Sequence, residues 1–129
     1  MKKILLLITI AIITFSLSAE SKQLYLEKKY QEQWCNTQSN CIMEYELPDK
    51  TRVDCLTLTH AIEFDFGKKW AEAIGQSLYY GLITNRKAGI VLILEDKSNE
   101  QKYLQRLLTV TEKYGIDVWV ISPESIPVN

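Results

Sequence analysis

The chain has 129 residues, of which 15 are basic and 16 acidic, for a formal net charge of −1. Without Lys2 and Lys3 of the leader described below, 13 basic residues face 16 acidic ones, so the mature chain carries about −3. This balance argues against a protein that binds nucleic acid tightly through a basic surface alone. The roughly 110 residues after the leader suffice for one hydrophobic core.

The chain opens with the pattern of a secretory signal peptide. Two lysines precede an apolar run over 4–15, and small residues follow at Ser16, Ser18 and Ala19. We therefore expect a signal peptide over 1–19, cleaved after Ser18 or Ala19. The apolar run is too short to span a bilayer comfortably, so we expect an exported protein, periplasmic or secreted, with no stable membrane span after cleavage.

After the leader we expect a single domain over 20–122. Helical spacing predicts a helix over 24–35, with Trp34 in the core, and alternation predicts a hairpin and a third strand. A core-facing stripe that includes Trp70 and Leu78 predicts a second helix over 68–83. A βαβ unit and a loose tail over 123–129 complete the chain. The predicted strands are 42–47, 51–57, 61–66, 88–94 and 116–121, and the last helix is 99–114.

This order, α-β-β-β-α-β-α-β, predicts the α/β class, with a mixed central sheet flanked by helices. Three cysteines, Cys35, Cys41 and Cys55, lie in the exported part, where disulfides can form. We expect one disulfide that uses Cys35, paired with either Cys41 or Cys55, and one free thiol. With His60 as the one histidine and no CxxC pair, a zinc site is not expected, and His60 is interpreted as an ordinary strand residue.

Acidic residues recur on the predicted strands. Asp54 lies on the second strand, and Glu63 and Asp65 share one face of the third. Asp65 by itself is interpreted as a solvated acid. Glu63 and Asp54 would meet on neighbouring strands, and clustered like charges are costly unless something binds between them.

These segments, 52–54, 61–65 and 69–80, resemble the motif ladder of the PD-(D/E)XK nuclease superfamily. Gln76 and Tyr80 match the Gln-x-x-x-Tyr helix of its RecB and lambda-exonuclease branch. The resemblance covers about Glu27 to Leu94 and implies a restriction-endonuclease-like fold. It also implies Asp54 and Glu63 as ligands of Mg²⁺ or Mn²⁺, with Glu27 as an auxiliary ligand.

The chain departs from this pattern at one position, because Asp65 stands where the superfamily usually has its lysine. The resemblance implies that Lys69 on the following helix supplies the missing ammonium, with Gln76 and Tyr80 supporting the site. The expected function is an exported, metal-dependent nuclease-like protein that hydrolyses phosphodiester bonds of nucleic acid. The alternative is an inactive domain of the same fold that binds a protein partner or a second copy of itself.

Overall fold

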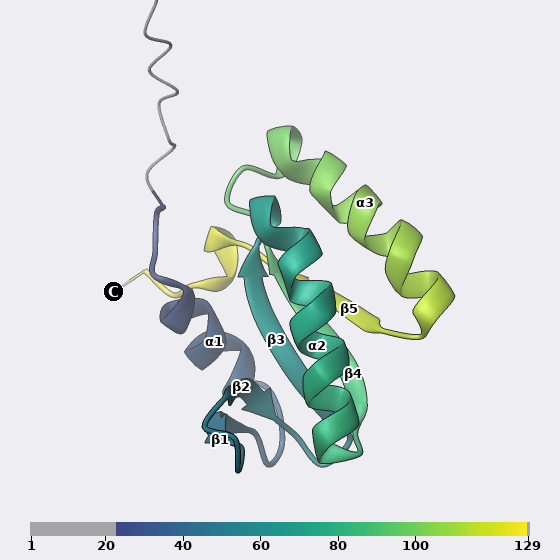
Figure 1. The fold of residues 1–129 in the computed structure, drawn as a ribbon. Helices are drawn as coiled ribbons and strands as arrows, with labels where there is room; N and C mark the ends of the chain where they lie inside the picture. Colours follow the sequence, from purple (N-terminus) through teal and green to yellow (C-terminus); the bar gives the residue numbers. More distant parts are fainter. Residues whose placement is uncertain (1–22, 129) are drawn as a thin grey trace, which may run out of the picture.

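The computed structural model describes residues 23–128, so the predicted signal peptide lies outside the described residues. The described part is an α/β fold with one five-stranded mixed sheet (Figure 1). Its strands are β1 Ile42–Glu46, β2 Arg52–Leu56, β3 His60–Phe66, β4 Lys87–Ile93 and β5 Asp117–Ile121. Its helices are α1 Glu27–Cys35, α2 Trp70–Thr84 and α3 Lys97–Tyr114, with 3₁₀ helices η1 Gly67–Lys69 and η2 Pro123–Ser125. None of the described helices is both long and apolar enough to cross a membrane.

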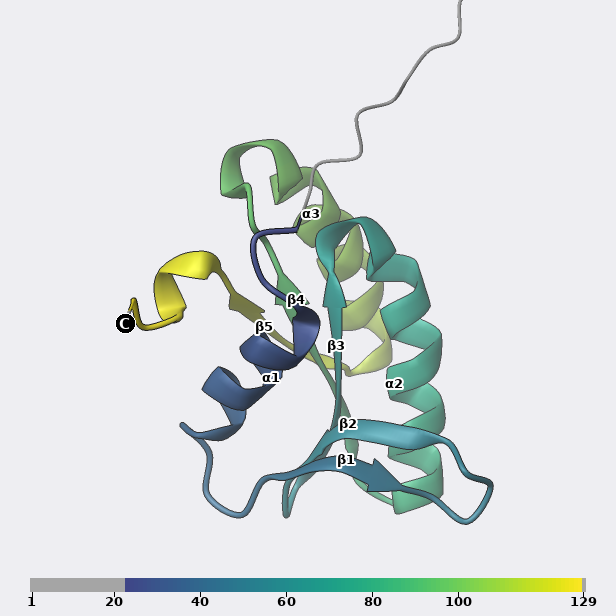
Figure 2. The same cartoon turned by 90° about the vertical axis from the view of Figure 1, so that its left-hand side faces the viewer.

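The strands lie in the sheet in chain order, and their directions confirm the predicted topology. β1, β2 and β3 form an antiparallel meander, and β4 and β5 are added in parallel. The two parallel connections run through α2 and α3. Since such crossovers are right-handed and the strands advance in one direction, both helices lie on the same face. Helix α1 lies on the opposite face (Figures 1 and 2).

Each face of the sheet has its own hydrophobic core. On the α1 face, the ring of Trp34 makes edge contacts with Phe64 and Trp119, at centroid distances of 5.7 and 5.6 Å. This confirms Trp34 as a core residue. On the other face, α2 and α3 cover the buried Ile90 and Leu92 of β4. Strand β4 is therefore buried on both sides, as its unbroken apolar sequence predicts.

Helix α2 begins later than predicted, and its predicted core-facing stripe is confirmed except at Leu78. Residues 67–69 form η1, so Lys69 precedes α2 rather than lying on it. Tyr80 is buried, whereas Leu78 is 42% exposed, so the prediction of Leu78 as a core residue is wrong. The helix ends where Asn85 adopts a left-handed conformation, with φ 50°.

The segment before α1 is fixed by one carboxylate. Glu95, which follows β4, accepts hydrogen bonds from the backbone amides of Leu24 and Tyr25 and from the hydroxyl of Tyr30. The Tyr30 hydroxyl lies 2.7 Å from Oε1 of Glu95. This contact joins the start of α1 to the carboxyl end of the sheet.

The end of the chain is more ordered than predicted. Residues 123–125 form η2, and Ile126 is only 3% exposed within the core on the α1 face. The prediction of a loose tail is wrong for this part, because one apolar side chain after Pro123 reaches the core. A single buried residue leaves no periodic pattern in the sequence.

We predict that Ile126→Ala lowers the free energy of unfolding by about 2 kcal/mol or more, the lower part of the range for such truncations. Urea unfolding followed by circular dichroism measures the change. Val128→Ala is the matched control, since Val128 is 94% exposed, and it should change stability by less than about 0.5 kcal/mol. Equal effects of the two variants would contradict the docked tail.

Candidate functional site

The candidate site lies on β3, at the point where its pairing with β2 ends. Strand β2 pairs with β3 only at Cys55 with Ile62 and Leu56 with Ala61, whereas β3 pairs with β4 as far as Phe66. The second half of β3 therefore has an unpaired edge on the β2 side. Backbone amides at such an edge need other acceptors when they are buried.

Two aspartates supply those acceptors. The amide of Phe64 donates to Oδ2 of Asp54 over 2.8 Å, and the amide of Phe66 donates to Oδ1 of Asp65 over 3.0 Å. Each carboxylate thus replaces a missing ladder partner. Asp65 is only 5% exposed, so its interpretation as a solvated acid is wrong. Burial raises the pKa of Asp65 to about 7, and the charge of Glu27 adds to the effect.

Glu63 has no such structural partner. It lies on the same face of β3 as Ala61, is 5% exposed, and its Oε2 is buried without a hydrogen-bond partner among residues 23–128. Burial raises the pKa of Glu63, and the charge of Asp54 raises it further. Burial also raises the pKa of Asp54, although its bond from Phe64 opposes this. We call Asp54 and Glu63 the carboxyl pair.

Glu27 and Lys69 flank this pair. Glu27 is the first residue of α1, and Nε2 of Gln31 donates to its Oε1 over 3.1 Å. Burial raises the pKa of Glu27, while the ammonium of Lys69 opposes that shift. The same ammonium also opposes the raised pKa of Asp65. Lys69 makes no ion pair within 4.0 Å in the described part of the chain, so its charge remains available.

Gln76 and Tyr80 border the pair from α2. Tyr80 is 7% exposed and packs with Val53, Leu56 and Ala61. Burial raises the pKa of its hydroxyl, and the charges of Glu63 and Asp54 also contribute. Gln76 is exposed one turn earlier, and its side chain opposes the raised pKa of the Tyr80 hydroxyl. The predicted helix motif thus lies beside the predicted acids.

The predicted site residues shift one another's pKa values, so they lie near one another. The three acids, however, are not close enough together to form a ready-made metal site. Within residues 23–128, the one group of three His, Cys, Asp or Glu ligand atoms lying mutually within 4.8 Å consists of the three cysteines. Glu27, Asp54 and Glu63 do not meet that spacing. The structure therefore presents two acids on neighbouring strands with Glu27 nearby, rather than a preassembled three-carboxylate centre.

Two residues near the carboxyl pair, Gln31 and Glu44, were not predicted from the sequence. Gln31 is buried and contacts Glu27 from one helical turn later, a spacing that could have revealed it. Glu44 on β1 raises the pKa of both Glu27 and Asp54. Its φ of 51° is unusual within a strand and leaves no trace in the sequence.

Comparisons with known proteins gave no match to this chain. None was found among protein-family models, curated proteins or solved structures.

We predict that Glu63→Gln stabilises the metal-free protein at about pH 8 by roughly 1–3 kcal/mol. At that pH the wild type must take up a proton at Glu63, or bury an unpartnered carboxylate, in order to fold, and glutamine removes this cost while keeping the side-chain shape. Carboxyls whose pKa is raised by folding bind protons in the folded state. The wild type should therefore be most stable near pH 5 and lose stability as pH rises through the raised pKa values. Chemical unfolding in the presence of a chelator measures both effects.

Glu112→Gln is the matched control, because Glu112 is an exposed glutamate on α3. It should leave the pH dependence of stability unchanged. If Glu63→Gln destabilised the protein at about pH 8, the ionised carboxylate would instead be an essential part of the fold.

Proposed function

We propose that this protein is an exported, metal-dependent phosphodiesterase of nuclease type, restriction-endonuclease-like in fold, that acts on nucleic acid. The observation that carries the proposal is the buried Oε2 of Glu63, which has no hydrogen-bond partner among residues 23–128 and lies beside the carboxylate of Asp54. A buried polar atom left without a partner costs free energy, and a bound ligand would repay that cost.

The chemistry of the carboxyl pair fits Mg²⁺ or Mn²⁺. These ions take oxygen ligands, and Mg²⁺ is commonly bound by one or two carboxylates together with waters and substrate phosphate. Asp54 and Glu63 would hold the ion, and Glu27 would serve as an auxiliary ligand. When bound, such an ion stabilises charge on a phosphate and lowers the pKa of water.

The remaining residues act on the substrate or support the site. The ammonium of Lys69 has no ion pair within 4.0 Å among the described residues, so it can stabilise the charge that builds on a reacting phosphate. This role replaces that of the lysine expected where Asp65 stands. Gln76 is exposed and can orient water or the substrate backbone, and Tyr80 would support it from one helical turn later.

A second candidate function is an inactive domain of this kind that binds another protein. It is favoured by Asp65, a buried acid in place of the expected lysine, and by the net negative charge of the chain. The same acids would then have a structural role at the edge of β3. The two functions differ in whether the protein cleaves nucleic acid.

We predict that Mg²⁺ binds more tightly at about pH 8 than at about pH 6, because protons held by the carboxyl pair compete with the ion. Calorimetric titration in buffers of different ionisation enthalpy should also detect proton release on binding. Glu63→Gln should abolish the binding, and Glu112→Gln should not. Affinity independent of pH, with no proton release, would contradict a site at the carboxyl pair.

We predict that Lys69→Ala retains Mg²⁺ binding but lowers the rate of nucleic-acid cleavage by about 10²-fold or more, the scale for loss of a charge stabiliser. Lys68→Ala is the matched control, because Lys68 lines a separate hollow with Glu95 and Tyr103. Cleavage of labelled single- and double-stranded DNA and RNA measures the rate. Metal binding by the wild type without any cleavage would favour the protein-binding function.

A further inference from the structure

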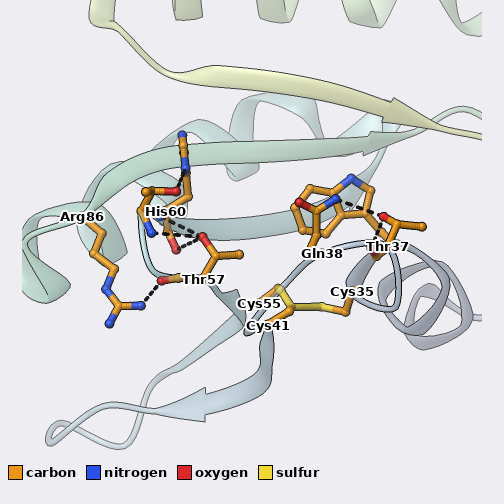
Figure 3. Close-up of a disulfide and its surroundings, with 10 residues drawn as sticks. Cys35, Thr37, Gln38, Cys41, Cys55, Thr57, His60 and Arg86 are labelled. Atoms are coloured by element: carbon orange, nitrogen blue, oxygen red, sulfur yellow. Dashed lines mark hydrogen bonds between the residues drawn. A yellow bond between two sulfur atoms is a disulfide. The ribbon is translucent and has the colours of Figure 1, made fainter.

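The structure gathers all three cysteines at one place. Cys35 ends α1, Cys41 precedes β1 and Cys55 lies on β2, yet their sulfurs lie within 4.8 Å of one another (Figure 3). Cys35 and Cys55 are buried in the core on the α1 face, and Cys41 is half-buried at its margin. The end of α1, the loop before β1 and strand β2 thus converge on a single sulfur cluster.

Cys41 is the shared member of this cluster. Its Cα lies 5.6 Å from that of Cys35 and 6.1 Å from that of Cys55, and both separations are within the range that a disulfide spans. A cysteine sulfur forms only one disulfide at a time, so either pairing leaves the third thiol beside the bond. Three thiolates around a soft metal ion would instead put net negative charge into an apolar core, which is costly.

We infer that this cluster is a thiol–disulfide exchange site in which Cys41 alternates between Cys35 and Cys55. The thiolate of Cys55 attacks Sγ of Cys41, the new bond between them forms, and the bond from Cys41 to Cys35 breaks. The electron pair goes to the sulfur of Cys35, which takes up a proton as Cys55 has released one. The exchange involves no net oxidation.

Forming the first disulfide needs a small-molecule disulfide as oxidant. Oxidised glutathione serves, since it accepts two electrons from the cysteine pair and becomes two thiols. Cys41 is the entry point for the oxidant because it is the least buried of the three cysteines.

The two pairings restrain different parts of the fold. The bond from Cys35 to Cys41 ties the last residue of α1 to the loop before β1. The bond from Cys41 to Cys55 ties that loop to β2, next to the pairing of Met43 with Cys55. Exchange therefore transfers the anchor of the loop from the helix to the sheet and releases the end of α1.

The test uses the mature wild-type chain, equilibrated in a buffer of reduced and oxidised glutathione. Acid quenching stops exchange, and the free thiols are then alkylated under unfolding conditions before digestion with trypsin. One tryptic peptide, 30–50, contains Cys35 and Cys41, and another, 53–68, contains Cys55. Tandem mass spectrometry of the linked and alkylated peptides identifies which cysteine is free.

We predict two populations, one with Cys35 alkylated and one with Cys55 alkylated, each with a single disulfide at Cys41. Cys55→Ser and Cys35→Ser should each retain the one remaining pairing with Cys41. A single linkage in the wild type at equilibrium would overturn the exchange, and so would a wild-type bond between Cys35 and Cys55 with Cys41 alkylated. The wild-type measurement decides the matter even if a variant fails to fold.

Discussion

The early end of the pairing between β2 and β3 is the constraint on which the rest of this structure depends. Because β3 continues past Ile62 without a strand partner on that side in the described part of the chain, its amides need acceptors that the sheet does not provide. Asp54 and Asp65 provide these acceptors, so both carboxyl groups point towards the backbone of β3. One irregularity in strand pairing thus brings acidic side chains together on one edge of the sheet.

Much of the fold could be predicted because each element has a clear pattern. The period of two over 61–66 places Glu63 and Asp65 on one face, and the apolar run at 88–94 indicates a central strand. The order of strands follows from these patterns and the short connections. The limits of β2–β3 pairing could not be predicted, since they depend on how two strands diverge in space. The burial of Asp65 and the docking of Ile126 depend on that geometry and on packing across the chain.

Within the carboxyl pair, Glu63 is an exception to the rule that buried polar groups have partners, because its Oε2 has none among residues 23–128. Burial and the neighbouring Asp54 raise the pKa of Glu63, so the fold keeps a carboxyl where an apolar residue would pack at less cost. Local conflicts of this kind are typical of sites where function outweighs stability. The sequence indicated the two acids as candidates, but only the structure distinguishes them. Asp54 has an amide to satisfy, and Glu63 does not.

The placement of the tryptophans has an optical consequence. Trp34 and Trp119 are in contact on the α1 face, and Trp34 immediately precedes Cys35, whereas Trp70 packs on the opposite face near α3. Trp34 and Trp119 therefore lie in the same core as the sulfur cluster, and Trp70 lies in the core on the other face. In a fluorescence measurement, two of the three tryptophans therefore report on the α1 face of the sheet, and Trp70 on the other face provides an internal reference.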